Sequence, residues 1–227
     1  SERLTCNAIE WQYSEGGGVI IEASGAISIN NCRAQMALER ARRWIGAISP
    51  PDIRTYDESK TTRVWVARNA AFMRVWAPPI FLWSDLSSIK EDGQIIDVTG
   101  VTLLPCGAAR HAATLGGWPL AIRTGSRDMT AAVKLIKTVT SLEAQRRRAL
   151  QIDPHRPNDP HLPTMAALYD DPEIRARHSL FREVQFLTQN DGFAVRPSKA
   201  AGHLYPQVSK AYALAVAAIL YDGADAA

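Results

Sequence analysis

Three of the six tryptophans lie where they could bind a polar ligand. Each stands at an expected turn or strand end beside a charged residue or a glycine pair: Trp11 beside Glu10, Trp76 near Arg74, and Trp118 after Gly116 and Gly117. Sugars present flat CH faces and a rim of hydroxyls, which aromatic rings and charged or amide groups can recognise. The pattern therefore indicates a carbohydrate-binding site. Packing of all three rings in the core is the alternative that the sequence leaves open.

The Gly-Gly-Trp pattern lies inside Ala112–Ile122, an apolar stretch whose alternation is typical of a half-buried strand. Gly116 and Gly117 permit a positive φ or a close approach of the backbone to another group. Trp118 would then stand at the mouth of the strand, where its ring could stack on a ligand.

Other kinds of site find little support in the sequence. The five histidines show no metal-binding spacing, and neither a nucleophile elbow nor a phosphate-binding glycine loop is present. Glu10 and Asp170-Asp171 are the candidate acids of a glycosidase, but the aspartates are better explained as a helix cap. We therefore expect no catalytic residue, no metal and no cofactor, in a protein that is not an enzyme.

The composition sets further limits on the class of protein. The 227 residues are 46% apolar and carry a net charge of +3, without a basic stripe interleaved with aromatics, so no nucleic-acid partner is expected. No apolar run approaches the length of a membrane span, and no membrane insertion is expected. For Cys6, Cys32 and Cys106, both one disulfide with a free thiol and three buried thiols fit the spacing.

Hydrophobic periodicity and helix caps predict short strands that alternate with helices, which is an α/β pattern. The expected strands cover residues 19–22, 69–76, 98–104 and 112–122. The expected helices are one capped by Asn30 or Asn31 with an apolar stripe reaching Ile48, one over 57–67, two over 130–150 with a break at Thr140-Ser141, one from Asp171 to about 189, and one over 204–219.

A series of short motifs along nearly the whole chain follows the order of a known family. These are Leu4–Trp11 with Gly16–Gly18, Ile29–Asn31, Ala37–Ala41 with Ser49–Pro51, Asn69–Arg74, Leu103–Pro105, Ala112–Leu120, Thr140-Ser141, Pro163-Thr164 with Ala167–Glu173, Arg196-Pro197, and Tyr205 with Gln207–Ser209. Together they resemble the C-terminal portion of the extracytoplasmic sugar-binding, or solute-binding, proteins of ABC importers. Within that family they look most like the trehalose, maltose and α-glucoside group.

The resemblance implies an α/β fold of the periplasmic-binding-protein type II, in which two lobes close on a sugar. We expect a truncated form with most of the second lobe and a return segment of the first. Residues 1–110 would be the second-lobe α/β portion, 111–152 the return segment, and 153–227 a helical part that packs on the second lobe. The Gly-Gly-Trp segment would then lie where the chain crosses the cleft.

The resemblance also carries the family's sugar-cleft positions onto this chain. They are Trp11, Trp76, Gly117, Trp118 and Arg196, with Glu10 beside them. By this resemblance, Trp11 and Trp76 would stack on sugar rings, and Arg196 would donate paired hydrogen bonds to hydroxyls. Gly117 would offer its backbone amide.

The function implied is that of a solute-binding protein, or a truncated remnant of one, with a periplasmic or extracytoplasmic location. It would bind an oligosaccharide such as a trehalose- or maltose-type disaccharide without catalysis, and ABC permease subunits would be its partners. The alternative is a truncated homologue reused as an interaction or scaffold module, with weak or no sugar binding. Since a missing lobe would leave apolar surface exposed, we expect a homo-oligomer.

Overall fold

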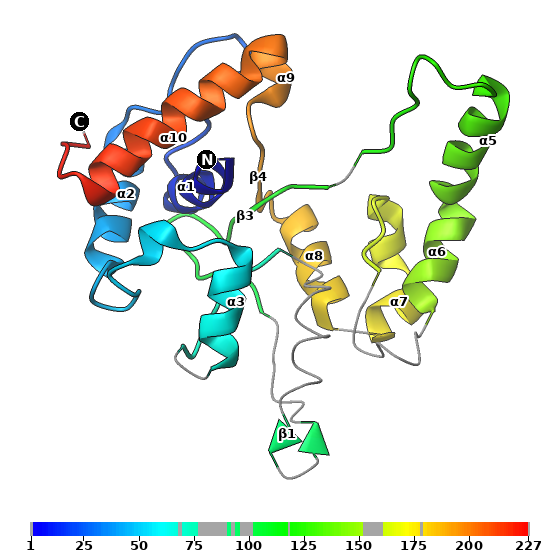
Figure 1. Ribbon diagram of the computed structural model, residues 1–227, viewed down its shortest axis with the longest axis horizontal. Helices are drawn as coiled ribbons and strands as arrows, with labels where there is room; N and C mark the ends of the chain where they lie inside the picture. Colours follow the sequence, from blue (N-terminus) through cyan, green and yellow to red (C-terminus); the bar gives the residue numbers. More distant parts are fainter. Residues whose placement is uncertain are drawn as a thin grey trace. The chain divides into compact units, whose positions relative to one another are not determined.

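The computed structural model describes residues 2–67, 70–76, 90–91, 94–95, 102–117, 119–151, 161–177 and 179–226 (Figure 1). The chain divides into two units, each drawn from more than one stretch of sequence: unit 1 is Ser1–Asp57, Leu103–Gly116 and Gln189–Ala227, and unit 2 is Glu58–Thr102 and Gly117–Thr188. The chain passes from unit 1 to unit 2 between Gly116 and Gly117. The lobe boundaries expected from the resemblance remain a prediction.

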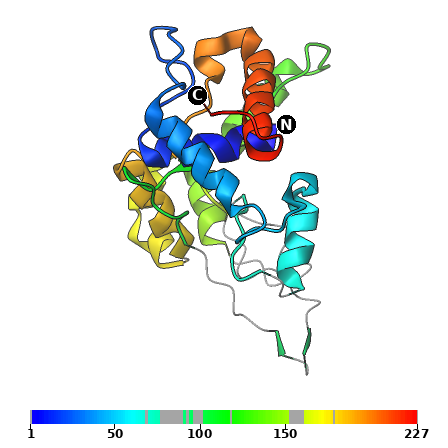
Figure 2. The same cartoon turned by 90° about the vertical axis from the view of Figure 1, so that its left-hand side faces the viewer.

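Unit 1 is built mainly from long helices. Its elements are α1 (Glu2–Glu15), α2 (Cys32–Trp44), the 3₁₀ helix η1 (Ile53–Thr55), β3 (Ala113–Thr114), β4 (Phe193–Ala194), α9 (Ser198–Ala201), the 3₁₀ helix η3 (Gly202–Leu204) and α10 (Tyr205–Tyr221). Helix α1 packs against both α2 and α10, as both ribbon views show (Figure 1, Figure 2). The buried side chains at this junction are Ala8, Leu38, Ala41, Val216, Ile219 and Leu220.

A pair of very short strands attaches to this three-helix core. Strand β3 pairs in parallel with β4, with Ala113 opposite Phe193 and Thr114 opposite Ala194. A second buried cluster joins Ile9 of α1 to Ala194 of β4 and to Ile20. Ile9 therefore helps to hold the segments around Ile20 and Ala194, which are far apart in the sequence, against α1.

Unit 2 has its own core around its later helices. Its elements are α3 (Glu58–Val66), β1 (Lys90–Glu91) paired antiparallel with β2 (Gln94–Ile95), α5 (Met129–Val139), α6 (Leu142–Leu150), the 3₁₀ helix η2 (Ala166–Asp170), α7 (Pro172–Arg177) and α8 (Ser179–Gln189). The core consists of Ala149, Leu168, Tyr169, Ile174 and Phe181. The Tyr169 hydroxyl donates to the carbonyl of Pro163 at 2.7 Å, and burial raises the pKa of Tyr169 to about 12.

The helix caps predicted from the sequence are confirmed. Asn31 caps α2 and Ser141 caps α6, each by accepting a hydrogen bond from the backbone amide three residues on. Asp171 accepts from the amide of Glu173 at 2.9 Å, and Pro172 opens α7 as expected. These caps are local in sequence, which is why the pattern alone predicts them.

The strand predictions are largely wrong. Residues 70–76 and 102–104 contain no strand, and the rest of the expected strands at 69–76 and 98–104 lies outside the described residues. The side chain of Phe72 is 88% exposed, although a buried strand was expected there. Among the described residues of 112–122, only Ala113–Thr114 form a strand, and the 19–22 strand reduces to a single bridge between Ile21 and Ile27. A strand needs a partner, and sequence periodicity does not reveal whether one is adjacent.

The helix predicted after Asn31 is shorter than expected. Helix α2 ends at Trp44, and Ile48, which was assigned to its apolar stripe, is 78% exposed. A positive φ at Gly46 turns the chain directly after the helix. None of the helices within the described ranges has the length and apolar character needed to cross a bilayer.

Replacing Asn31 with alanine is expected to destabilise unit 1 by about 2 kcal/mol, because this residue caps α2 and also hydrogen-bonds two carbonyls of the preceding loop. Its Oδ1 accepts from the amide of Ala34 at 3.1 Å, while Nδ2 donates to the carbonyls of Gly17 at 2.8 Å and Ser28 at 2.9 Å. Urea unfolding followed by circular dichroism measures the loss. The matched control is Asn30→Ala at the neighbouring exposed position, which should change stability by less than about 0.5 kcal/mol. Equal midpoints for the two variants would contradict the assigned role.

Candidate functional site

Helix α1 carries two of the predicted sugar-cleft residues and anchors a third. Glu10 and Trp11 lie inside α1, and Arg196, which follows β4, forms an ion pair with Glu2 at the start of the same helix. These residues belong to unit 1, whereas Trp76 and Gly117 belong to unit 2.

Glu10 is a buried residue that holds strand β3. Glu10 is only 4% exposed, and its Oε1 accepts a hydrogen bond from the backbone amide of Thr114 in β3 at 2.8 Å. The Thr114 hydroxyl in turn donates to the carbonyl of Cys6 at 2.8 Å. Two buried hydrogen bonds thus hold β3 on α1, two residues before the chain leaves unit 1. Contact of Glu10 with a sugar remains a prediction.

Trp11 packs edge-on against Trp44 of α2. The two ring centroids are 5.7 Å apart with an angle of 88° between the planes, and Trp11 is half-buried against the three-helix core. The expected position at a turn or strand end is wrong, since Trp11 lies well inside α1. This T-shaped contact contributes to the packing of α1 on α2. Stacking of Trp11 on a sugar remains a prediction.

Arg196 takes part in a polar network centred on the carboxylate of Glu2. Arg196 Nη1 donates to Glu2 Oε1 at 2.9 Å, and the hydroxyls of Tyr205 and Ser209 also donate to this carboxylate. Partial burial works to raise the pKa of Glu2, but the three hydrogen bonds together bring it below its ordinary value. Burial and the neighbouring Glu2 raise the pKa of Tyr205 to about 12. The network therefore holds Glu2 as an anion and orients the guanidinium of Arg196.

The unit 2 residues lie in irregular segments. The guanidinium of Arg74 stands over the ring of half-buried Trp76, with 4.3 Å between its Cζ and the ring centroid. Gly117 is exposed, has no positive φ, and has open space around the position of a Cβ atom. Gly117 therefore shows neither the positive φ nor the close backbone approach that the sequence analysis expected of it. Trp118 lies outside the described residues.

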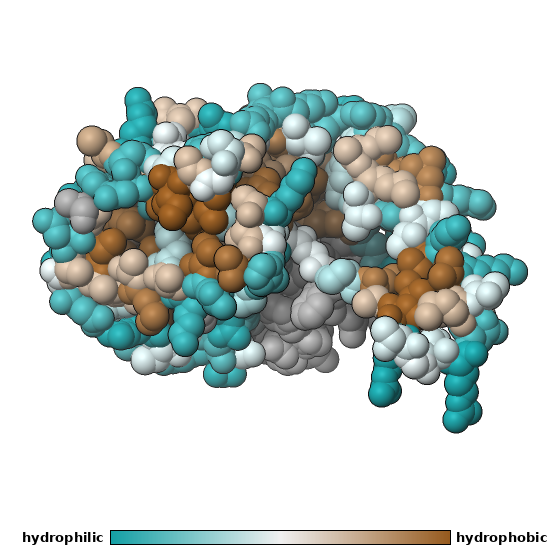
Figure 3. All heavy atoms as spheres, turned by 90° about the horizontal axis from the view of Figure 1, so that it is seen from above, coloured by the Kyte–Doolittle hydropathy of each residue, from teal (hydrophilic) through white to brown (hydrophobic). Residues whose placement is uncertain are grey.

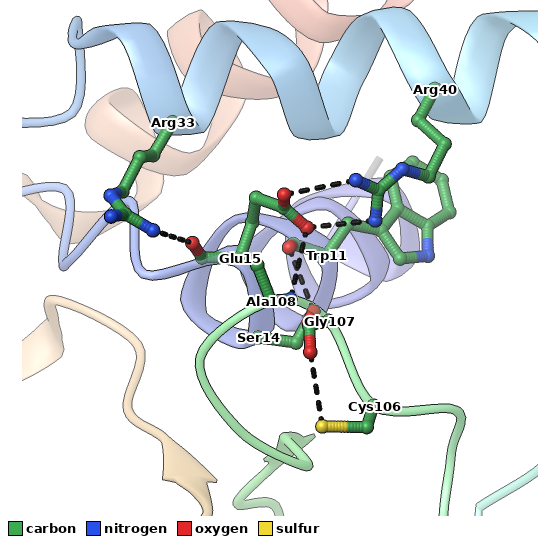
Figure 4. Close-up of polar contacts among 8 residues, drawn as sticks. All are labelled: Trp11, Ser14, Glu15, Arg33, Arg40, Cys106, Gly107 and Ala108. Atoms are coloured by element: carbon green, nitrogen blue, oxygen red, sulfur yellow. Dashed lines mark hydrogen bonds and ion pairs between the residues drawn. The ribbon is translucent and has the colours of Figure 1, made fainter.

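An ion pair that the sequence pattern did not predict joins a buried carboxylate at the end of α1 to a partly exposed arginine of α2. Glu15 is only 3% exposed, and both of its oxygens accept from Arg40 of α2, at 2.7 and 2.9 Å (Figure 4). The amide of Ala108 donates to Glu15 Oε2 at 3.3 Å, and Arg33 donates to the Glu15 carbonyl at 3.2 Å. The hydrogen bond from Arg40 is the main reason that the pKa of Glu15 lies below its ordinary value. Helices α1 and α2 and the 103–112 loop meet at this carboxylate.

Gly107 brings that loop into direct contact with the backbone of α1. A Cβ atom at this position would lie 2.5 Å from the carbonyl carbon and oxygen of Ser14. The same carbonyl accepts from the amides of Ala109 and Arg110 at 2.9 and 3.1 Å. The missing side chain of Gly107 therefore permits the hydrogen bonds that dock the loop leading to β3.

The three cysteines are free thiols. Cys6 is buried, but Cys32 and Cys106 are exposed, so the structure matches neither the alternative of one disulfide nor that of three buried thiols. The Cys106 thiol donates to the carbonyl of Gly107 at 3.0 Å (Figure 4).

Known proteins provide an independent guide to the fold. No protein-family model matches the chain. It is 36% identical over 220 residues to a "Probable ABC transporter-binding protein" of Deinococcus radiodurans, and the match covers 96% of this chain and 49% of that protein. It is also similar to the solved structure of maltose-bound MalE3 of T. maritima, with 31% identity and a TM-score of 0.74, over 99% of this chain and 54% of that one.

These similarities establish the fold class. The chain has the α/β fold of MalE-type periplasmic binding proteins, as predicted, and spans about half the length of the proteins it matches. Its similarity to an ABC transporter-binding protein and to a maltose-bound protein supports the predicted resemblance to sugar-binding solute-binding proteins, without distinguishing a group among them.

Replacing Glu15 with glutamine should lower stability at neutral pH by about 1–3 kcal/mol, because the charge that Arg40 binds is removed. The pKa of Glu15 in the folded chain lies below its ordinary value of 4.5. The carboxylate therefore stabilises the fold fully above that value, and its contribution disappears as the pH falls through the lower folded pKa. The difference in unfolding free energy between the parent chain and Glu15→Gln should shrink accordingly on acidification, as measured by urea unfolding across pH.

The control for this variant is Glu39→Gln, which weakens the exposed pair between Glu39 and Arg42 at 3.8 Å on the surface of α2. It should cost less than about 0.5 kcal/mol at neutral pH, because exposed pairs contribute little. A loss in Glu15→Gln that does not depend on pH would count against the role assigned to the carboxylate.

Replacing Gly107 with alanine should destabilise unit 1 by about 2 kcal/mol or more, since the new Cβ would collide with backbone atoms that cannot rotate away. Gly125→Ala is the matched control, because nothing lies within 4 Å of a Cβ at that position. Thermal unfolding measures both variants. Similar melting temperatures for the two would show that the loop does not approach Ser14 as closely as described.

Proposed function

We propose that this chain acts as the carbohydrate-binding component, or part of one, of an ABC importer. It would bind an oligosaccharide such as a trehalose- or maltose-type disaccharide, outside the cytoplasm, and pass it to permease subunits without catalysis. The observation that carries the proposal is the match, over nearly the whole chain, to a maltose-bound protein of the same fold. The similarity to an ABC transporter-binding protein supports the transport role.

Sugar binding in this proposal depends on aromatic stacking and on oriented donors. A sugar ring would stack on the face of Trp76 opposite Arg74, whose guanidinium covers the other face. The guanidinium of Arg196 carries five N–H donors, and its contact with Glu2 uses Nη1, so further donors are present for sugar hydroxyls. Trp11 and Trp118 would add stacking surface, Gly117 an amide donor, and Glu10 would hold the crossing segment in place.

The oriented arginine gives this site a defined chemical preference. Because Glu2 already binds Arg196 and the hydroxyls of Tyr205 and Ser209, the local charge is balanced before a ligand arrives. A neutral, hydroxyl-rich ligand fits such a site better than an anion, which the Glu2 carboxylate would repel. Closure of two lobes around the sugar would supply the remaining affinity by excluding water.

Isothermal titration calorimetry of the chain with maltose, trehalose and sucrose tests the proposal, with sorbitol as a ligand control. Heat of binding is expected with at least one disaccharide and none with sorbitol. The variant Trp76→Ala should weaken binding by about tenfold or more, because a stacking ring is lost. The control variant Trp65→Ala, in α3 and outside the predicted cleft positions, should retain the affinity of the parent chain.

Absence of heat with all three disaccharides would overturn sugar binding by this chain. That outcome would instead favour the alternative, a related chain that serves as an interaction or scaffold module. Light scattering on the same sample tests the homo-oligomer expected from the sequence, and a monomer would contradict that expectation.

A further inference from the structure

The hydroxyl of Tyr205 lies beside Arg196, although Tyr205 is not among the sugar-cleft positions predicted from the sequence. Tyr205 opens α10, and its hydroxyl donates to Oε1 of Glu2, the same oxygen that accepts from Arg196 Nη1 at 2.9 Å. One carboxylate oxygen therefore brings the phenolic oxygen and the guanidinium next to each other. The side chains of Arg196 and Glu2 are 31% and 44% exposed, so this group of residues lies at the surface of unit 1.

The charge of Glu2 fixes the direction of the hydrogen bond that Tyr205 makes. Partial burial works to raise the pKa of Glu2, but the hydrogen bonds to its carboxylate bring it below its ordinary value. An ionised carboxylate can only accept, so the single proton of the Tyr205 hydroxyl is directed at Glu2. Burial and the neighbouring Glu2 raise the pKa of Tyr205 to about 12, and the hydroxyl therefore keeps this proton at neutral pH. Its oxygen is left as an acceptor.

Buried hydroxyls hold the other side of the carboxylate. Ser209 is only 4% exposed, and its hydroxyl donates to Glu2 Oε2. Thr5 is fully buried, and its Oγ1 lies 2.9 Å from Ser209 Oγ and 3.1 Å from the Ser209 carbonyl oxygen. Glu2 and Thr5 belong to α1, whereas Tyr205 and Ser209 belong to α10, and these two helices pack together. The helix packing therefore determines where the carboxylate lies.

Arg196 and Tyr205 offer the two halves of a hydrogen-bonding pair. A guanidinium can only donate, whereas the Tyr205 oxygen, with its proton directed at Glu2, can accept. A sugar hydroxyl does both, so a single hydroxyl can accept from Arg196 and donate to Tyr205. A ligand carboxylate has no proton with which to make the second bond.

The surface around this pair is both polar and apolar. Seen from above, on the side where Figure 1 places α9, the molecule shows hydrophilic and apolar side chains interspersed (Figure 3). Leu204, directly before Tyr205, is 45% exposed, and Val195, directly before Arg196, is 54% exposed. Such a surface suits a sugar, whose ring presents CH groups as well as hydroxyls.

We propose that Tyr205 is a specificity-determining residue of the sugar site. Its oxygen accepts a hydrogen bond from the same ligand hydroxyl that accepts from Arg196, and Glu2 is the positioning residue that directs the proton of Tyr205. The inference rests on the sugar binding proposed above and adds a chemical requirement to it. The ligand must carry a free hydroxyl at this position, where an ether or an anionic group would bind more weakly.

The first test uses whichever of maltose, trehalose and sucrose binds best, together with analogues in which fluorine replaces one hydroxyl at a time. Fluorine can accept weakly from Arg196 but cannot donate to Tyr205. By titration calorimetry, one analogue should bind the parent chain about tenfold more weakly than the disaccharide itself. In Tyr205→Phe the disaccharide should also bind about tenfold more weakly, and that analogue should bind no worse than the disaccharide, because the partner of the lost proton is gone.

Tyr56→Phe is the matched control, because the Tyr56 hydroxyl also donates to a carboxylate, that of Asp52 at 3.1 Å, away from the predicted cleft positions. It should keep the affinity of the parent chain and the same losses across the analogues. Identical losses across the analogues in Tyr205→Phe would show that Tyr205 acts through packing alone, which would overturn the inference but leave sugar binding standing. If the parent chain binds none of the three disaccharides, sugar binding and this inference fall together.

The second test needs no sugar and does not depend on the Tyr205→Phe variant. An NMR titration of the tyrosine ring carbon that bears the hydroxyl should give a pKa of about 12 for Tyr205 in the parent chain. In Glu2→Gln this pKa should be lower, because a neutral amide no longer disfavours the phenolate. The same pKa in both chains would mean that Glu2 does not direct the Tyr205 proton, and would overturn the inference.

Discussion

The bidentate ion pair between Glu15 and Arg40 is the constraint on which the arrangement of unit 1 depends. A carboxylate that is almost completely buried must be fully hydrogen-bonded, and here a guanidinium from α2 and the amide of Ala108 meet that need. Satisfying one charge therefore fixes the positions of two helices and of the loop that leads to β3. The same loop approaches α1 closely at Gly107, where a Cβ atom would lie 2.5 Å from the carbonyl of Ser14.

Helix α1 is the central element of unit 1, and three carboxylates along its length hold other segments against it. Glu2 near its start orients Arg196 and receives hydroxyls from α10, Glu10 in its middle holds β3, and Glu15 at its end holds α2 and the loop. Each carboxylate binds a segment that is remote in sequence. In the proposed sugar site, these contacts would orient the arginine and the crossing segment before a ligand binds, which reduces the entropic cost of binding.

The two units differ in how completely they bury their helices. In unit 1, α1, α2 and α10 bury an apolar cluster, whereas in unit 2 no residue of α5 belongs to the buried cluster formed by the described residues. The fold is shared with proteins about twice as long, and α5 leaves the side chains of Met129, Val133 and Leu135 exposed.

The sequence by itself determined the features that depend on neighbours in the chain. The caps at Asn31, Ser141 and Asp171, the break before α6 and the fold class follow from local hydrogen bonding, periodicity and ordered motifs. Only the tertiary structure decided that, of the expected strands, the described residues keep just Ala113–Thr114 and a single bridge at Ile21, because pairing requires a partner that periodicity does not specify. It also decided that Glu10 and Glu15 are buried supports, since their partners lie 104 and 25 residues away, and a charge becomes a structural anchor only when folding removes it from water.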